Sequence, residues 1–326
     1  MINFPRQTKV IEVGPRDGLQ SFHRWIDTDV KVRMIDRLSD AGLPVIEATN
    51  FAHPRAIPTL RDAEEVMARI TRRPGTVYRA LAPNAKGAER AVAARADEIL
   101  GLITVSATYT QKNQNMTIDQ AVEQAGLAFR IADKAGIGFV MALGMSFWCA
   151  YEGRIPEQQV FDLLTRFRAF GIARFYLAGS VGMEDPRHVN GLFSGIRDRW
   201  PDIEIGYHVH NLSGAGTANL LAALDGGASS VEGSICGIGG GMTLPSKLGA
   251  VGNLPTEDIV QLLNDAGVET GIDTDAVKDA ARDIAGWLDI EPRSHVAHSG
   301  TRRDIMASAH SHLDSHSDSH QHAQAG

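Results

Sequence analysis

The sequence predicts an α/β fold and, more specifically, a closed (β/α)8 barrel. Apolar segments of strand length recur eight times along the chain, and each ends near a Gly, Pro, Asn or Asp residue. Helical patterns follow these segments, and regular alternation of strands with helices is typical of a parallel sheet. Eight strand–helix units are the number found in a closed (β/α)8 barrel. The alternative fold for the same alternation is an open doubly wound sheet.

The expected strands follow one another at intervals that leave room for a helix in each gap. They cover residues 9–17, 44–51, 76–84, 98–107, 138–145, 173–182, 204–211 and 229–237. Among the gaps, residues 28–42 and 216–227 have apolar side chains three and four positions apart, which predicts helices that pack on the strands. The barrel therefore extends over residues 7–270. An extra C-terminal helix is expected outside it, at residues 274–290.

The C-terminal end of the chain has a different composition. Residues 294–326 are poor in apolar side chains and contain seven of the 12 histidines. This composition is typical of a disordered segment. We therefore expect a catalytic domain over residues 1–293 and a disordered His-rich tail over residues 294–326. Weak binding of a transition metal by these histidines is an alternative to a tail without a role.

Composition also limits the partners and the compartment. The formal net charge of −7 argues against nucleic acid as a partner, because binding phosphates requires clustered Lys and Arg. No apolar run reaches the roughly 18 residues of a membrane span, so no membrane contact is expected. The two cysteines cannot form a disulfide framework, and the first residues resemble no targeting segment. These features predict a cytoplasmic protein that acts on a small molecule.

Residues that can bind a metal or take part in catalysis lie at the ends of the expected strands. Arg16 and Asp17 close the first strand, Glu47 lies on the second, and the seventh ends with His208 and His210. In a parallel barrel all these strand ends meet at one mouth, where the active site is built. We therefore expect the five side chains to converge.

Two histidines two residues apart on a strand share a face, so His208 and His210 can bind one metal. Asp17 and Asn253 would add oxygen ligands. Mixed nitrogen and oxygen ligands suit Mg or Mn, with Co or Zn as alternatives. Beside such a metal, Arg16 would stabilise an enolate oxygen. The alternative for Arg16 is an internal ion pair with Glu47, which would otherwise orient groups or relay a proton.

Several segments resemble 3-hydroxy-3-methylglutaryl-CoA lyases, a family of metal-dependent lyases built on the TIM barrel. They read VIEVGPRDGLQ, GLPVIEATNFAHPRAIPTLRDAEEVM, LAPNAKGAERAV, VSATYTQKNQNMT, YEGRI and GNLPTEDIV, in order over residues 7–265. The resemblance implies a divalent metal held by the residues that match Asp17, His208, His210 and Asn253, and a catalytic residue at Arg16. It also implies retro-Claisen cleavage of a 3-hydroxyacyl-CoA and a homodimer.

The chain departs from the family pattern at four places. The lyase loop GLGGCP, whose cysteine is catalytic, reads GIGGGM, so Gly241 stands where the thiol is expected. The LADT motif reads LAGS, with Gly179 and Ser180 replacing an acid and a threonine. The letters MSFW precede CAYEG, where Cys149 matches, and HxHD reads HVHN, with Asn211 in the last position. Other candidates for the missing thiol's role are Cys236, Tyr109, Ser180, a metal-bound water and the two histidines.

The glycine-rich stretch that contains Gly239, Gly240 and Gly241 follows the eighth strand. It does not open a helix after a first strand, so it is not a dinucleotide fingerprint, and we interpret it as a lid over the substrate. Besides these glycines, Gln20, Tyr109 and Ser180 are the expected substrate contacts, and Arg16, Glu47 and His208 are the expected catalytic residues.

The sequence therefore predicts a divalent-metal-dependent lyase that cleaves a carbon–carbon bond in a 3-hydroxyacyl-CoA. The lost cysteine and the bulk that MSFW adds suggest a substrate other than hydroxymethylglutaryl-CoA, and citramalyl-CoA-like and longer-branched 3-hydroxyacyl-CoA compounds fit equally well. Two alternatives are a Claisen-type synthase that joins acetyl-CoA to a 2-oxo acid and a catalytically silent barrel that binds a metal or ligand. The HVHN motif favours the synthase, whereas the VGPRDGLQ motif favours the lyase.

Overall fold

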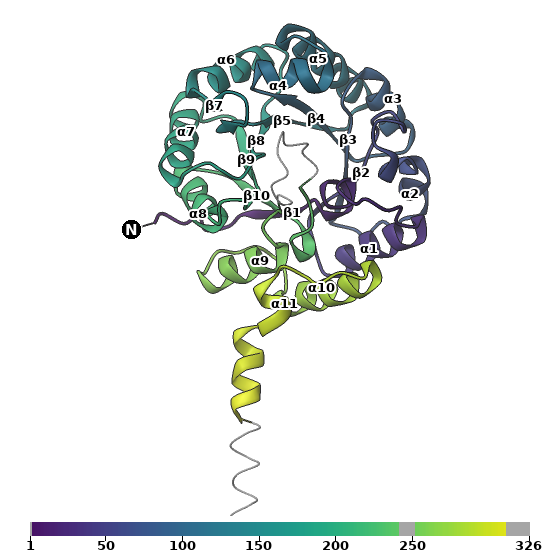
Figure 1. Cartoon of the computed structure of the whole chain (residues 1–326), viewed down its shortest axis with the longest axis vertical. Coiled ribbons are helices and arrows are strands. Elements are labelled where there is room, and N and C mark those ends of the chain that lie inside the picture. The colour runs from purple at the N-terminus through teal and green to yellow at the C-terminus, as the bar shows by residue number, and fades with distance from the viewer. Residues whose placement is uncertain (1, 241–251, 311–326) are drawn as a thin grey trace, which may run out of the picture.

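The computed structural model describes residues 2–240 and 252–310, and it confirms the predicted (β/α)8 barrel. The barrel strands are hydrogen-bonded in parallel in the closed order β1-β10-β9-β8-β5-β4-β3-β2. Figure 1 shows the ring of helices around them. The strands are β1 (Lys9–Glu12), β2 (Val45–Asn50), β3 (Val77–Leu81), β4 (Glu98–Thr104), β5 (Gly138–Gly144), β8 (Arg174–Gly179), β9 (Glu204–Val209) and β10 (Ser230–Gly233). Each lies within one of the predicted ranges.

The helices fill the gaps between the strands and continue beyond the barrel. They are α1 (Thr28–Asp40), α2 (Ala63–Arg69), α3 (Ala85–Ala93), α4 (Ala107–Gln114), α5 (Ile118–Ala135), α6 (Glu157–Arg168), α7 (Pro186–Arg199), α8 (Gly216–Gly226), α9 (Thr256–Asp265), α10 (Thr274–Leu288) and α11 (His295–Ser299). Short helical turns are η1 (Gly14–Gly18), η2 (Pro58–Leu60) and η3 (Ile235–Gly237), and β6 (Trp148–Cys149) pairs with β7 (Gly153–Arg154) in a hairpin. The extra C-terminal helix predicted at residues 274–290 is α10.

Local sequence explains where individual helices begin and end. At the start of α5 the Thr117 hydroxyl accepts a hydrogen bond from the Gln120 amide, and the Gln120 side chain accepts one from the Thr117 amide. This reciprocal cap satisfies two backbone donors that a helix start leaves free. The same helix ends at Gly136, whose φ of 69° is accessible to glycine at little cost.

Two apolar layers hold the barrel together. The larger layer lies between strands and helices and includes Phe175 and Leu177 of β8. A smaller one fills the barrel interior with Ile11, Val13, Val45, Leu81, Leu100, Val140, Ala142 and Tyr176. Tyr176 and Phe175 are neighbours on β8, and alternate residues of a strand point to opposite faces of the sheet. The odd-numbered residues of β8 therefore face the helices, and the even-numbered ones face the interior.

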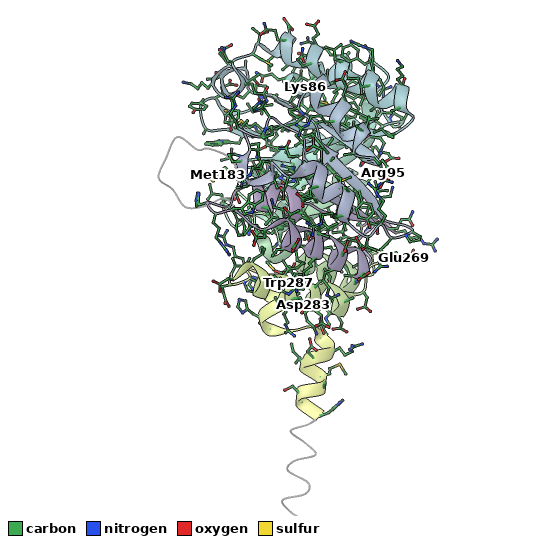
Figure 2. All side chains as sticks on the ribbon, turned by 90° about the vertical axis from the view of Figure 1, so that its right-hand side faces the viewer. Lys86, Arg95, Met183, Glu269, Asp283 and Trp287 are labelled. Carbon is green, nitrogen blue, oxygen red and sulfur yellow. The ribbon has the colours of Figure 1, made fainter. Side chains whose placement is uncertain are left out.

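The two ends of the barrel carry different parts of the chain. Figure 2 shows the molecule from the side, with Met183, which follows β8, on one edge and Glu269 and Arg95, which lie near strand starts, on the other. The strand ends that carry the predicted site residues therefore open on the side of Met183. Within residues 2–240 and 252–310, none of the helices is both long and apolar enough to cross a membrane.

The structure corrects the prediction for part of the tail. Ser294 caps α11 by accepting a hydrogen bond from the Ala297 amide, and it donates one to Asp258 of α9. Val296 and Ala297 are buried, and residues 302–310 continue as a helix. The expectation of disorder from residue 294 onward is therefore wrong for residues 294–310. Residues 311–326 lie outside the described part, and the domain boundary at residue 294 stays a prediction.

Candidate functional site

The turn η1 places Arg16 and Asp17 at the barrel mouth. Directly after β1, the amides of Asp17 and Gly18 both donate to the carbonyl of Val13, at 2.7 and 3.3 Å, which winds the chain into one wide turn. A Cβ on Gly18 would lie 2.5 Å from the Ile238 side chain, so glycine allows this close approach. The turn carries both site residues inward, and both are buried.

His208 and His210 point toward each other, as their spacing on β9 predicts. Their Nε2 atoms are 2.9 Å apart. The Nδ1 atom of His208 contacts a carboxylate oxygen of Glu232 at 2.8 Å, and Nδ1 of His210 contacts the Ser180 carbonyl at 2.8 Å. Because each Nδ1 faces an acceptor, the ring proton belongs there and the two Nε2 lone pairs face each other. Lone pairs at this distance repel unless a cation or a proton lies between them.

Asp17 and Asn253 complete the group. The Asp17 carboxylate lies 3.6 Å from Nε2 of His210, and the ligand atoms of Asp17, His208 and His210 all lie within 4.8 Å of one another. The Asn253 side-chain amide donates to Asp17 at 2.7 Å, and its buried Oδ1 has no hydrogen-bond partner among the described residues. A Cβ on Gly239 would lie 2.1 Å from that amide nitrogen, so a side chain there would displace Asn253.

These residues fit a divalent cation on structural grounds. Metal-binding histidines usually donate their other ring N–H to a carboxylate or a carbonyl, as both histidines do here. The unpartnered Oδ1 of Asn253 is an oxygen donor whose burial is costly unless it finds a partner. Burial alone would raise the pKa of Asp17, but Arg16 and the two histidines lower it well below its usual range. Asp17 therefore presents a negative charge to a cation.

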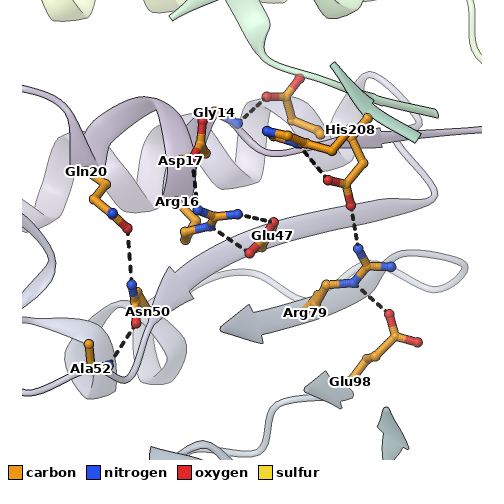
Figure 3. Close-up of polar contacts among 12 residues, drawn as sticks. Gly14, Arg16, Asp17, Gln20, Glu47, Asn50, Ala52, Arg79, Glu98 and His208 are labelled. Atoms are coloured by element: carbon orange, nitrogen blue, oxygen red, sulfur yellow. Dashed lines mark hydrogen bonds and ion pairs between the residues drawn. The ribbon is translucent and has the colours of Figure 1, made fainter. Parts of the chain in front are cut away.

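Arg16 is held by two carboxylates. Its Nε and Nη2 donate to Glu47 at 2.6 and 3.1 Å, and its Nη1 donates to Asp17 at 2.9 Å (Figure 3). The internal ion pair with Glu47, which the sequence left as an alternative, is thus present. The three contacts use three of the five guanidinium N–H groups, so two donors remain. Burial raises the pKa of Glu47, and the charge of Arg16 opposes that rise.

A second arginine lies deeper in the barrel and supports the histidines. Arg79 of β3 is fully buried and donates to Glu98 at 2.7 Å and to Glu232 at 2.9 Å. Glu232 in turn contacts His208, so the three side chains form one continuous chain, part of which Figure 3 shows. Arg79 and Glu232 were not predicted from the sequence. Their signal was a charged residue inside an apolar strand, in VYRAL and SSVEGS, because such a residue is buried only with a partner.

The barrel mouth contains a cavity of about 160 Å³ next to these groups. Arg16, Asp17 and the two histidines line it together with the predicted substrate contacts Gln20, Tyr109 and Ser180, while Leu100, Leu102, Ala142 and Tyr176 form apolar walls. Larger cavities of about 810 Å³ at the strand starts and about 460 Å³ beside Gly239 lie elsewhere. The site is assigned to the smaller cavity because the converging ligands and Arg16 line it.

The remaining predicted residues occupy several positions. Glu47 is behind Arg16, and Gly239 and Gly240 follow η3 with φ values of 139° and 107°. Gly241 lies outside the described residues. The inserted Phe147 is fully buried and packs against Tyr207 and Phe193, with ring centroids 5.7 and 6.4 Å away. The expectation that the MSFW insertion adds bulk to the pocket is therefore wrong for Phe147, because Tyr207 and Phe193 belong to the layer beneath the helices.

Cys236 is placed unlike a catalytic thiol. Its sulfur donates to the carbonyl of Ala281 in α10 at 3.2 Å, and the residue is fully buried. Burial, together with Glu257 and Glu12, raises the pKa of the thiol. Cys236 therefore stays protonated and packs against α10, which agrees with the packing role expected for a buried cysteine.

Known proteins resemble this chain over most of its length. The family model described as HMGL-like matches residues 7–284. Mitochondrial hydroxymethylglutaryl-CoA lyase of Mus musculus is 36% identical over 91% of this chain and 90% of its own length, and the Bacillus subtilis lyase is 35% identical over 88% and 93%.

Solved structures show the same likeness. The HMG-CoA lyase of Bacillus subtilis has a TM-score of 0.86 at 34% identity and covers 90% of this chain and 97% of that one. An HMG-CoA lyase from Acinetobacter baumannii, in complex with coenzyme A and 3-methylmalate, also has a TM-score of 0.86, at 36% identity over 93% and 98%.

Proposed function

This chain belongs to the HMGL-like family, and from that premise we propose that it is a carbon–carbon lyase that acts on a 3-hydroxyacyl-CoA similar to hydroxymethylglutaryl-CoA. The observation that carries the proposal is the convergence of Asp17, His208 and His210 beside Arg16 in one cavity. Assembly as a homodimer and a cytoplasmic location belong to the same proposal.

The reaction is a retro-Claisen cleavage. The substrate's 3-hydroxyl gives its proton to a solvent water molecule, the bond between C2 and C3 breaks as the C3 carbonyl forms, and the electron pair passes to an acyl-CoA enolate. A proton added to the enolate carbon then gives the acyl-CoA product. Asp17, His208, His210 and Asn253 would hold a divalent cation, Mg or Mn by ligand type, which when bound acts as a Lewis acid toward the substrate's oxygens.

His208 is assigned to metal binding rather than to proton transfer. Its Nδ1 is taken by Glu232, so Nε2 alone is free for either role. Although burial lowers the pKa of His208, the contact with Glu232 raises it overall, and the proton belongs on Nδ1. Arg16 would use its two remaining N–H groups to stabilise the negative charge that develops on the enolate oxygen.

Tyr109 is the residue we assign to proton return in place of the family's cysteine. It lines the cavity, as Ser180 does, but a phenol is a far stronger acid than an aliphatic alcohol. Burial raises the pKa of Tyr109, with smaller contributions from Tyr151 and Cys149, so the hydroxyl stays protonated at neutral pH. The Tyr109→Phe variant is expected to slow product formation while metal affinity stays unchanged.

The deciding experiment is an assay of the purified protein with Mn²⁺. Hydroxymethylglutaryl-CoA and both enantiomers of citramalyl-CoA are supplied, and acetyl-CoA release is measured. We expect release with at least one substrate and its loss, by a factor of about 10³ or more, in Asp17→Ala and His208→Ala, with exposed Glu89→Ala as the control. Calorimetry shows whether Mn²⁺ is bound. Bound Mn²⁺ without acetyl-CoA from any substrate would contradict the proposal.

A further inference from the structure

At the end of β8, the Glu184 side chain occupies the space that a side chain at position 179 would need. A Cβ placed on Gly179 would lie 1.8 Å from Oε1 of Glu184 and 2.5 Å from its carboxyl carbon. A Cβ atom does not approach a non-bonded carbon or oxygen atom this closely, so the Glu184 carboxylate fills the volume that a side chain at position 179 would enter. The carboxylate reaches this place from the loop after the strand, whereas its neighbour Met183 is exposed (Figure 2).

Glu184 is firmly held where it lies. The Tyr207 hydroxyl of β9 donates to its carboxylate at 2.8 Å, and the Asn219 side chain of α8 donates to its backbone carbonyl at 3.0 Å. Its second oxygen, Oε2, is buried and has no partner among the described residues. Burial raises the pKa of Glu184, while hydrogen bonds and the nearby His210 oppose the rise. A buried carboxylate with so few partners is costly, which argues for a role beyond packing.

The turn between Gly179 and Glu184 leads directly to a predicted metal ligand. The Ser180 carbonyl in this turn accepts a hydrogen bond from Nδ1 of His210, and the Gly179 carbonyl accepts one from the His210 amide at 3.4 Å. A Cβ on Gly182 would lie 2.6 Å from the Leu212 amide nitrogen, so the turn packs closely on the chain after β9. Because Glu184 joins one end of this turn to β9 and α8, it fixes the carbonyl that orients the His210 ring.

We propose that Glu184 is a positioning residue for His210, and that it supplies from the loop the carboxylate that an acidic side chain at position 179 would supply from the strand. The inference rests on the proposed function, because it takes His210 as a metal ligand. Glu184 does not line the cavity and touches no reacting atom. Its effect therefore passes through the Ser180 carbonyl and the ring of His210.

The two positions allow the carboxylate to be moved back to the strand. The change Glu184→Ala removes it and is expected to weaken Mn²⁺ affinity by roughly 10 to 100-fold, as for other residues that orient metal ligands. The double change Gly179→Asp with Glu184→Ala places a carboxyl group one bond beyond a Cβ position that lies 2.5 Å from the original carboxyl carbon. It is expected to recover most of the lost affinity. The isosteric Glu184→Gln retains an oxygen acceptor for Tyr207 and should lose less than Glu184→Ala.

The measurement is Mn²⁺ affinity by calorimetry on metal-free protein, without substrate, alongside thermal unfolding of each variant and a Glu89→Ala control. A purely structural role would lower stability and leave the affinity of folded protein unchanged. Wild-type affinity in folded Glu184→Ala, or a double variant that is folded and no better than the single, overturns the inference. If Glu184→Ala does not fold, a folded double variant that binds Mn²⁺ at least about 10-fold more weakly than wild-type protein overturns the inference as well. Wild-type protein that binds no Mn²⁺ overturns the proposed metal site itself, and this inference with it.

Discussion

Two groups of buried carboxylates lie on either side of the turn η1, and their environments differ sharply. Asp17 and Glu47 face Arg16 at the cavity. Glu12 and Glu257 lie behind the turn and accept hydrogen bonds from backbone amides and from Thr256, and no Lys or Arg of the described residues forms an ion pair with either. We call these the cavity pair and the rear pair. All four residues are essentially fully buried, so burial alone does not distinguish the pairs.

The pKa values differ because only the cavity pair has a guanidinium, which lowers the pKa of Asp17 and limits the rise that burial causes in Glu47. Burial would raise the pKa of Asp17, yet Arg16 takes it well below its usual range. In the rear pair nothing opposes burial strongly enough, and the pKa rises to about 7 for Glu12 and about 8 for Glu257. The Glu12 carboxylate accepts hydrogen bonds from the Gly14 amide at 2.6 Å and the Ile235 amide at 2.9 Å. The rear pair therefore shapes the turn, while Asp17 of the cavity pair supplies a negative charge to the site.

Removing the Arg16 guanidinium should abolish the difference between the cavity pair and the rear pair. Among the changes to Arg16, Glu12 and Cys236, we expect it to lower kcat most. In Arg16→Gln the enolate loses its charged donor, and kcat is expected to fall by roughly 10² to 10³-fold, as for other donors aimed at developing charge. The variant also leaves Glu47 buried without its partner, which costs about 3 to 5 kcal/mol of stability. Steady-state kinetics and thermal unfolding measure the two effects.

The double variant Arg16→Gln, Glu47→Gln separates stability from activity. Both side chains are then neutral and can still hydrogen-bond, so much of the lost stability should return. Activity should not return, because the charged donor is still absent. A double variant with wild-type kcat would show that Arg16 acts only through its ion pair with Glu47.

Neutralising the rear pair should change stability and leave chemistry intact. The folded-state pKa of Glu12 is about 7, against an ordinary value near 4.5. Below pH 4.5 the carboxyl is protonated in both states and contributes nothing. As the pH rises toward 7 the unfolded chain gains from ionisation while the folded chain does not, so wild-type protein loses on the order of 3 kcal/mol.

The Glu12→Gln variant cannot ionise and should escape this loss. Its free energy of unfolding, measured by urea at several pH values, is expected to exceed that of wild-type protein increasingly between pH 4.5 and 7 and by a constant amount above pH 7. Equal pH dependence of the two proteins would contradict the raised pKa. Acetyl-CoA release at pH 7 serves as a check that the turn η1 keeps its shape.

The sequence predicted the parts of the site that follow from local rules. The sequence shows the strand ends, the two-residue spacing of His208 and His210, and Asp17 after the first strand. These features predict a common site because parallel strands bring their ends together. Glu184 was not predictable in this way. Glu184 lies five residues after Gly179, and its contact with that position depends on a turn that folds back on the strand, which neither residue shows in the sequence.

The tail shows a second limit of sequence interpretation. The average composition of residues 294–326 indicated disorder, but its first residues have a specific environment. Ser294 caps α11 and bonds to Asp258, and Val296 packs in the interior. A few buried side chains and one cap hold a short helix against α9 and α10, and an average over 33 residues hides them.

The Cys236→Ala variant tests whether the residues behind the turn η1 take part in the reaction. We expect its effect to be smaller than those of the Arg16 and Glu12 variants. Its thiol, like Glu12 and Glu257, is kept neutral by burial, and it contacts the carbonyl of Ala281 rather than the cavity. Its backbone φ of 59° is unfavourable for Cys and Ala alike, so Cys236→Ala adds little backbone strain. We expect kcat/KM within about threefold of wild type and a stability loss of about 1 kcal/mol from the small cavity. A fall of two orders of magnitude in kcat, with Mn²⁺ affinity unchanged, would instead make this thiol the replacement for the cysteine missing at position 241, and would extend the chemistry to the side of η1 that holds the rear pair.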